Sequence, residues 1–350
     1  MGTAGAARKL ASAAAFGGGG LSVLGAGLYG VLRAEAKLAR RAIGEPSAGH
    51  RPPESSGWYG RGRPGPAIRL VLLGDSSAAG YGVDRVEDTP GAQLASGIAT
   101  QANRRVHLRE FAKVGARSSD LAVQVEAALL TEPDIAVILI GANDVTHSVL
   151  PSQSVQHLAE GVRLLREEGC TVVVGTCPDL GTIKPIAPPL KQVARSWSRR
   201  LAAAQTIAVV EEGGRTVALA SILGPEFAAA PAVLFGPDQF HPSADGYKQL
   251  ASVLIPSCLA ALGLIPEDEA LPEAYRGEGV LPVAAAAVRA VKTPGTELGG
   301  TEVSGAQRGL RGRWVELRHR RRHPHAEVES PEETEDTEAS PDQEPAAIDG

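Results

Sequence analysis

The sequence predicts an α/β protein of three layers, in which a doubly wound, mostly parallel sheet has helices on both faces. Two observations predict this fold class. Short apolar runs that suit fully buried strands recur along the chain, and segments with helical periodicity separate them. Strands that alternate with helices imply parallel pairing through right-handed crossovers, which place helices on both faces of the sheet. The 350 residues, 43% of them hydrophobic, suffice for a packed core.

Five segments form the expected strands. They are IRLVLLG at 68–74, HLREFAKV at 107–114, DIAVILIG at 134–141, TVVVGT at 171–176 and TVALASI at 216–222. Three of them are continuous apolar runs of the kind that is covered on both faces.

Helical patterns follow these segments. We expect helices over 91–102, 118–130, 154–169, about 189–210 and 243 to about 262. Ser118 or Ser119 can cap the second helix, and Gly169 stands where a helix commonly ends.

Cysteine content and charge exclude some classes of function. Cys170 and Cys177 flank a strand and would lie about 23 Å apart at about 3.3 Å per residue, too far for a disulfide. With Cys258 they lack the spacing of metal ligands, so we expect small buried thiols. The formal net charge of −5 is mild, and we expect no nucleic-acid partner.

The N-terminal region, 1–43, reads as a signal or membrane-anchor segment. Residues 10–32 carry no charge, follow Arg8 and Lys9, and are about long enough to span a bilayer. The small-residue triplet at 34–36 resembles a cleavage site, whereas the basic residues after the run favour retention in the cytoplasm. We expect association with the cell envelope, either membrane-anchored or secreted, with the face of the membrane left open.

Composition divides the rest of the chain. Residues 44–66 are rich in Pro, Gly and Ser and read as a linker, and 67–265 hold the predicted α/β domain. Residues 266–350 carry a basic block followed by an acidic block, which predicts a disordered tail.

Polar residues stand where the strands end, and ligands of such sheets bind outside the carboxyl ends of the strands. The first strand leads into Ser76, the second into Gly115 and the third into Asn143, and Asp238 and His241 precede the last helix. This set contains a hydroxyl nucleophile, an imidazole base, a carboxylate and oxyanion donors. It is the inventory that acyl transfer requires.

Each residue suits one role in that chemistry. Ser76 needs a base, and His241 has Asp238 three positions before it, where a carboxylate can fold back and orient the ring. The backbone N–H groups of Ser76 and Gly115 and the Asn143 amide can form an oxyanion hole, and Gly115 would let the backbone come close.

Other readings of these segments are weaker. A lipase-type G-x-S-x-G elbow would need a glycine where Ala78 stands, and a phosphate-binding loop would need a lysine that GDSSAAGYG lacks. We interpret Asp75 and Asp144 as residues that brace loops. His147 reads as a residue at the rim of the pocket or at a helix start.

These motifs resemble the SGNH hydrolases, also called the GDSL esterase and lipase family. The resemblance rests on GDSSAAG around Ser76, VGARSSDL with Gly115, GAND with Asn143, and DQFHPSADGY with Asp238 and His241, in the family's order. It implies a flavodoxin-like fold, a triad of Ser76, Asp238 and His241, and an oxyanion hole of Ser76, Gly115 and Asn143. Ser77 stands where the family commonly has leucine.

The sequence therefore predicts a monomeric serine hydrolase that cleaves carboxylic esters through an acyl-enzyme, without metal or organic cofactor. Its substrate would be a small-molecule, lipid or acetylated carbohydrate ester. Residues 177–190, with Cys177 at their base, and 223–237 would form the pocket walls. The alternative is a catalytically inactive, membrane-tethered binding or scaffold protein that uses the same fold and the charged tail.

Overall fold

The centre of the molecule is a parallel sheet with the strand order β3-β2-β4-β5-β6. Short strands pair antiparallel at its two edges, β1 on β3 and β7 on β6. The bounds are β1 Gly57–Tyr59, β2 Ile68–Gly74, β3 Val106–Glu110, β4 Ile135–Leu139, β5 Thr171–Gly175, β6 Arg215–Val217 and β7 Glu297–Leu298. The order reverses between β2 and β4, as in a doubly wound sheet.

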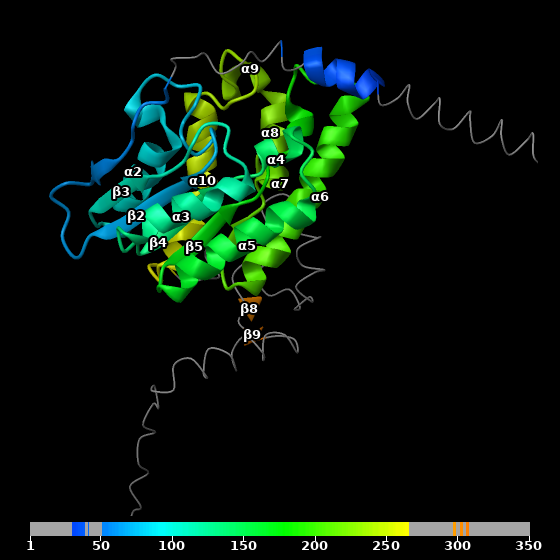
Figure 1. Cartoon of the computed structure of the whole chain (residues 1–350). Helices are drawn as coiled ribbons and strands as arrows, with labels where there is room; N and C mark the ends of the chain where they lie inside the picture. Colours follow the sequence, from blue (N-terminus) through cyan, green and yellow to red (C-terminus); the bar gives the residue numbers. More distant parts are fainter. Residues whose placement is uncertain are drawn as a thin grey trace, which may run out of the picture. The chain divides into compact units, whose positions relative to one another are not determined.

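Helices cover both faces of the sheet, which confirms the predicted three layers (Figure 1). Helices α2 (Pro90–Ala102) and α10 (Ala244–Ala261) pack together on one face. Helices α3 (Leu121–Leu129), α5 (Pro151–Glu167) and α6 (Leu190–Glu211) follow one another on the other face. Short helices near the carboxyl ends of the strands are α4 (Ala142–Thr146), α7 (Leu219–Ile222), α8 (Gly224–Ala229) and α9 (Pro231–Leu234).

The buried strands divide the core into two apolar clusters. Along β2, Leu70 and Leu72 contribute to the cluster under α2 and α10, whereas Val71 and Leu73 contribute to the one under α3 and α5. All four side chains are almost fully buried. Burial on both faces is why this strand reads as an uninterrupted apolar run instead of an alternating one.

Three predicted elements differ from the structure. Strand β3 ends at Glu110, so the last four residues of the predicted 107–114 strand lie in the loop that follows it. Strand β6 ends at Val217, and the remainder of the predicted 216–222 strand turns into α7. The prediction was wrong there because a run of four apolar or small residues fits a buried helical turn as well as a strand. A 3₁₀ turn, Ser118–Asp120, precedes α3, and neither serine caps that helix, because Ser118 donates its hydroxyl to Asp144 instead.

The sheet also begins earlier than the predicted domain boundary. Strand β1 lies within the predicted linker 44–66, and the segment before it is held by Ser55, whose hydroxyl donates to Glu110 at the end of β3. The Pro and Gly content of this segment therefore marks turns around an edge strand. Strands β7, β8 (Glu302–Val303) and β9 (Ala306–Gln307) fall within the predicted tail.

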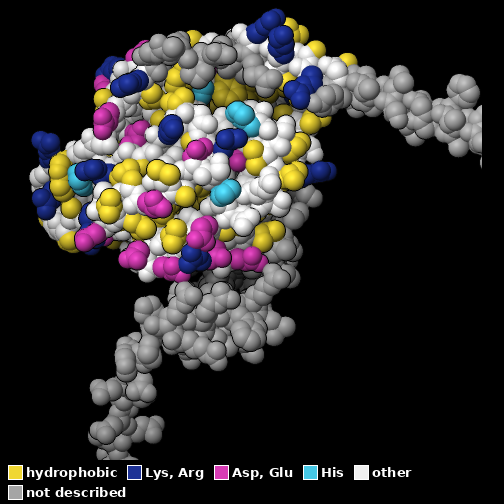
Figure 2. Space-filling model, in the orientation of Figure 1, with side chains coloured by type: hydrophobic (Ala, Val, Ile, Leu, Met, Phe, Trp, Pro, Cys, Tyr) yellow, Lys and Arg dark blue, Asp and Glu magenta, His cyan; other side chains and the backbone are white. Residues whose placement is uncertain are grey.

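This computed structural model describes residues 30–38, 41 and 51–265, with the backbone of the short strands after residue 296. The predicted signal or anchor segment and the charged tail lie mostly outside the described residues. Within the described residues, no helix is both long and apolar enough to cross a membrane. Side chains of both charge signs lie on the face shown in Figure 2.

Candidate active site

Ser76 lies immediately beyond β2, at the carboxyl edge of the sheet. Gly74 ends the strand with φ of +139°, and a Cβ there would overlap the carbonyl oxygen of Leu139 on β4. The Asp75 N–H donates to that same oxygen at 3.0 Å. Glycine is therefore required where the chain leaves the strand, and the turn that follows places Ser76, only 6% exposed, above the sheet.

Two buried glutamines fix the loops around this turn. Gln124 of α3 accepts a hydrogen bond from Gly74 N–H at 2.7 Å and donates to the Gly74 carbonyl at 3.0 Å. In the same manner Gln205 of α6 accepts from Cys177 N–H and donates to the Ile140 carbonyl. Sequence reasoning missed both residues, although a glutamine among the apolar positions of a buried helix face is a signal for such a role.

His241 lies between Ser76 and Asp238. Its Nε2 is 2.9 Å from the Ser76 Oγ, and its Nδ1 is 2.6 Å from Asp238 Oδ2. Asp238 Oδ1 also accepts hydrogen bonds from the N–H groups of Phe240 and His241, both at 3.0 Å. The left-handed φ of +55° at Gln239 turns the chain back so that one carboxylate reaches all three donors. The structure thus brings these three predicted residues together.

The surroundings of Asp238 favour its charged form. Burial by itself would raise the pKa of this carboxyl, but hydrogen bonds from the His241 ring and from the Phe240 N–H outweigh it, and the pKa is lowered. An ionised carboxylate at Nδ1 directs the other ring nitrogen, Nε2, toward Ser76.

Aromatic side chains hold the imidazole from two sides. The His241 ring centroid lies 4.6 Å from that of Tyr81 and 4.8 Å from that of Phe240. Tyr247 in turn donates its hydroxyl to the Tyr81 carbonyl at 2.7 Å, which connects α10 to the loop after Ser76. These contacts were not predicted, because the sequence does not show which neighbouring side chain an aromatic residue contacts.

Asn143 and the loop that carries Gly115 are connected directly. Asn143 Nδ2 donates to the carbonyl of Ala116 at 3.0 Å. Gly115 has φ of +82°, and a Cβ built on it would meet no atom within 4 Å. The left-handed backbone by itself favours glycine at this position, and the predicted close approach of an oxyanion to this backbone stays a prediction.

Asp75 and Asp144, which we interpreted as residues that brace loops, both accept hydrogen bonds from neighbouring loop groups. Asp144 accepts from the N–H and hydroxyl of Ser118 and from the hydroxyl of Ser154, which joins the loops after β3 and β4 to α5. Asp75 accepts from the Ser77 N–H, and burial raises its pKa to about 6. His147 is exposed at the carboxyl end of α4, with Nδ1 2.8 Å from the Asn143 carbonyl oxygen.

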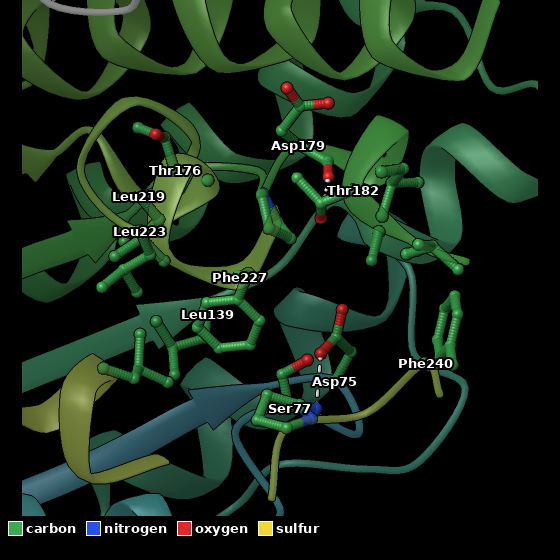
Figure 3. A pocket seen from close by; sticks show the side chains of 18 of the residues that line it. Asp75, Ser77, Leu139, Thr176, Asp179, Thr182, Leu219, Leu223, Phe227 and Phe240 are labelled. Carbon is green, nitrogen blue, oxygen red and sulfur yellow. Dashed lines mark hydrogen bonds between the residues drawn. The ribbon is translucent and has the colours of Figure 1, made fainter. Parts of the chain in front are cut away.

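A pocket lies along the carboxyl edge of the sheet (Figure 3). Its lining includes Asp75 and Ser77, the residues on either side of Ser76, but neither Ser76 nor His241. Both predicted wall segments contribute to it, 177–190 through residues such as Leu180 and Ile183, and 223–237 through Leu223 and Phe227. Cys177 is fully buried but does not line the pocket, so its predicted place at the base was wrong. Burial raises its pKa well above the ordinary value, which keeps the thiol protonated.

In the described part of the chain, no cluster of three or more His, Cys, Asp or Glu side chains is placed to hold a metal ion. The three cysteines are free and buried, as predicted from their spacing.

Comparison with known proteins identifies relatives of this chain. Residues 72–249 match the GDSL-like Lipase/Acylhydrolase family. The chain is 42% identical over 257 residues to the GDSL-like esterase Rv1075c of Mycobacterium tuberculosis, covering 70% of this chain and 80% of that protein. Among solved structures, TesA is 24% identical, with 55% of this chain and 99% of that chain covered at a TM-score of 0.44. Axe2, an acetylxylan esterase from Geobacillus stearothermophilus, is 18% identical, with 56% and 94% covered at a TM-score of 0.43.

Proposed function

The chain belongs to the GDSL-like lipase/acylhydrolase family and is a carboxylic ester hydrolase, and from this premise we propose that it works through an acyl-enzyme formed on Ser76. The observation that carries the proposal is the continuous line of hydrogen bonds from the Ser76 Oγ through the His241 ring to Asp238, at 2.9 and 2.6 Å. A serine within reach of a base, with the base held by a carboxylate, is the arrangement that activates a hydroxyl.

In the first half of the reaction, Ser76 Oγ attacks the ester carbonyl while His241 Nε2 accepts its proton. The imidazolium that forms is stabilised by Asp238 on its other nitrogen. When the tetrahedral intermediate collapses, the imidazolium returns the proton to the alcohol oxygen, the C–O bond breaks and the acyl group stays on Ser76. Water then repeats the sequence, with His241 as its base, and releases the acid.

The negative charge on the intermediate's oxygen needs donors, and we assign these to the Ser76 and Gly115 N–H groups and the Asn143 side chain. The bond between Asn143 and the Ala116 carbonyl supports this assignment, because it holds the amide next to Gly115. One of the two N–H bonds of the Asn143 amide serves that contact, which leaves the second for an oxyanion.

A fluorophosphonate probe tests the proposal, because it modifies only an activated serine. Wild-type protein should be labelled and should hydrolyse p-nitrophenyl acetate, and Ser76→Ala and His241→Ala should each lose both properties. Ser252→Ala, which changes an exposed serine of α10, serves as the matched control and should behave as wild type. Labelling that persists in Ser76→Ala would contradict the assignment of the nucleophile.

The labelling and ester assays also test the alternative that the chain is an inactive scaffold protein. A binding protein without catalysis has no use for an activated hydroxyl, so a folded chain that neither reacts with the probe nor hydrolyses any ester would favour that alternative.

A further inference from the structure

A helix at residues 30–38 precedes the domain, and one hydrogen bond joins it to α6. The backbone N–H of Leu190, the first residue of α6, donates to Glu35 Oε2 at 2.8 Å. Figure 1 shows this helix at the end of α6. The first N–H groups of a helix have no partner within it, and a carboxylate is a favourable acceptor for them. The contact therefore places the helix at 30–38 next to the pocket wall segment 177–190, which leads into α6.

One side of the helix at 30–38 leaves apolar side chains exposed. Val31, Ala34 and Leu38 are all exposed, and their spacings of three and four residues put them on one side of the helix. Val193, in the first turn of α6, is exposed as well. Single exposed apolar residues are common, but a stripe of them along a helix suits an apolar surrounding that the domain does not supply.

Basic side chains accompany these apolar ones. Segments 30–38 and 184–200 contain seven Lys or Arg residues and a single acidic residue, Glu35. The basic residues, of which all but Lys191 are exposed, are Arg33, Lys37, Lys184, Lys191, Arg195, Arg199 and Arg200. On α6, Lys191, Arg195 and Arg199 recur every four residues and so lie along one stripe. Arg195 and Arg199 share one carboxylate, that of Asp179, so positive charge remains in excess. Figure 2 shows Lys and Arg side chains at this end of the molecule.

The stability of α6 does not explain this charge. The start of a helix carries the positive end of its dipole, where a cation is unfavourable and an acidic side chain is favourable. The first turn of α6 nevertheless contains Lys191 and no acidic residue. The excess of positive charge therefore suits an anionic partner outside the chain.

A bilayer with anionic lipids matches both kinds of side chain. The uncharged run at 10–32 ends within the helix at 30–38, so a bilayer that holds this run lies next to the helix. Basic residues directly after such a run attract anionic headgroups, and exposed apolar side chains enter the boundary between headgroups and acyl chains. An acidic protein or a nucleic acid would use the charges but leave the apolar stripe in water.

We propose that the helix at 30–38 and residues 184–200 form a membrane-facing surface that lies on a leaflet containing anionic lipid. The expected envelope association concerns the run at 10–32, whereas this proposal names the side of the folded domain that meets the bilayer. It places the pocket wall 177–190 at the bilayer surface. The proposal does not depend on the role of Ser76, because it rests on contacts and charges outside the proposed triad.

Fluorescence quenching in the full chain tests which side meets the bilayer. All three native cysteines are buried, so a thiol-reactive NBD dye will label an introduced cysteine selectively. Val193→Cys places the dye in the first turn of α6, and Leu130→Cys, the control, places it directly after α3. Helices that follow parallel strands run back from the carboxyl edge of the sheet, so position 130 lies at the opposite edge. The labelled chains are reconstituted in phosphatidylcholine–phosphatidylglycerol vesicles in which some headgroups carry a nitroxide.

The nitroxide should quench the dye at 193 at least about 3-fold more than the dye at 130, because a helix of 22 residues separates the two edges by about 33 Å. Exposure to water would favour the opposite result, since Leu130 is 86% exposed and Val193 only 39%. Vesicles of phosphatidylcholine alone should lower the quenching at 193 toward that at 130, because the attraction to anionic headgroups is lost.

Charge reversal tests the basic residues. Lys184→Glu combined with Lys191→Glu should lower the quenching at 193 to the level at 130. Arg61→Glu combined with Arg104→Glu makes the same change of charge near the amino edge of the sheet and should leave the quenching at 193 unchanged.

Three results would overturn the proposal. They are equal quenching at 193 and 130 in anionic vesicles, quenching at 193 that survives reversal of Lys184 and Lys191, and a full chain that does not bind the vesicles. Failure of the proposed function is a separate result. A chain that shows the expected quenching but does not react with the fluorophosphonate would overturn the acyl-enzyme and leave the membrane-facing surface in place.

Discussion

The position of His241 is determined by groups on every side of its ring. Asp238 accepts from Nδ1, Ser76 lies at Nε2, and Tyr81 and Phe240 contact the ring itself. In the proposed mechanism, a ring held in this way would need no rearrangement before it accepts the proton of Ser76, which is the condition for efficient general-base catalysis.

Asn143 offers a prediction at the scale of one residue. Asn143→Ala should lower kcat by about 10²- to 10³-fold with little change in KM, because an oxyanion donor acts only once charge has developed in the transition state. Steady-state kinetics on a short-chain ester measure both constants. His147→Ala, at the exposed end of the same short helix, is the control and should retain wild-type values. A rise in KM with unchanged kcat would contradict the proposal that Asn143 is an oxyanion donor.

Among the elements, the carboxyl ends of the strands are held by the helices behind them. Gln124 on α3 pairs with both backbone groups of Gly74, and Gln205 on α6 joins the loop after β4 to the loop after β5. Both side chains are buried, so their partners have no water to replace them.

Gln124→Leu should therefore destabilise the fold strongly. It leaves the Gly74 N–H without its partner, whereas the Gly74 carbonyl keeps the hydrogen bond from the Lys113 N–H. One buried unpaired group costs about 1–3 kcal/mol, so we expect a loss of about 1–3 kcal/mol in the free energy of unfolding. Urea denaturation measures it. Gln101→Leu, on the exposed side of α2, should change stability by less than about 0.5 kcal/mol. Equal effects of the two substitutions would show that Gln124 does not hold β2.

A second element-scale feature is the carboxyl group at the end of β3. Glu110 Oε2 accepts the Ser55 hydroxyl at 2.5 Å, and the Glu110 N–H donates to Ser56. Burial raises the pKa of Glu110 from 4.5 to about 7, against the opposing effect of the Ser55 hydrogen bond. The residue thus joins the segment before β1 to the sheet while favouring its protonated form.

This contact predicts a pH dependence of stability. Between pH 4.5 and about 7 the folded state holds a proton on Glu110 that the unfolded chain has released, so the contribution of Glu110 to stability falls as pH rises through this window. Glu110→Gln removes the effect and should melt at a higher temperature than wild type at pH 8, with a smaller difference at pH 5. Glu126→Gln changes an exposed carboxyl of α3 and should show no such trend. A difference between Glu110→Gln and wild type that is the same at both pH values would contradict the assignment.

At the scale of the whole molecule, the described domain contains every residue proposed for the chemistry, and the uncharged run at 10–32 lies apart from it in the sequence. Strand β1 and the Ser55 contact show where the chain can be cut between the run at 10–32 and the domain. The cut must lie before residue 55, because the folded segment begins before it. A cut at the predicted boundary near residue 67 would remove an edge strand.

We therefore expect the full chain to pellet with membranes, and a chain that begins at residue 51 to stay in the supernatant with the same specific activity. The physical reason is that an apolar run of this length prefers a bilayer to water. Fractionation by ultracentrifugation, with an ester assay on each fraction, measures both. Recovery of the full, uncleaved chain entirely in the soluble fraction would refute the envelope prediction.

The amino-acid sequence alone determined the layers of the fold and the positions of Ser76, Asn143, Asp238 and His241 at the sheet edge. Buried parallel strands leave a clear apolar run, and parallel pairing brings their carboxyl ends to one edge whatever the detailed packing. The short spacing between Asp238 and His241 made their contact predictable, because it is local.

Only the tertiary structure decided which buried residues act on that edge. Gln124 and Gln205 look in the sequence like ordinary members of two helices. The segment with Leu219, which lines the pocket, was predicted to be a strand. Periodicity shows that a side chain faces the core, but not which backbone group or cavity it meets there. That depends on contacts between residues far apart in the chain, such as the 50 positions between Gly74 and Gln124, and these exist only once the sheet and its helices have packed.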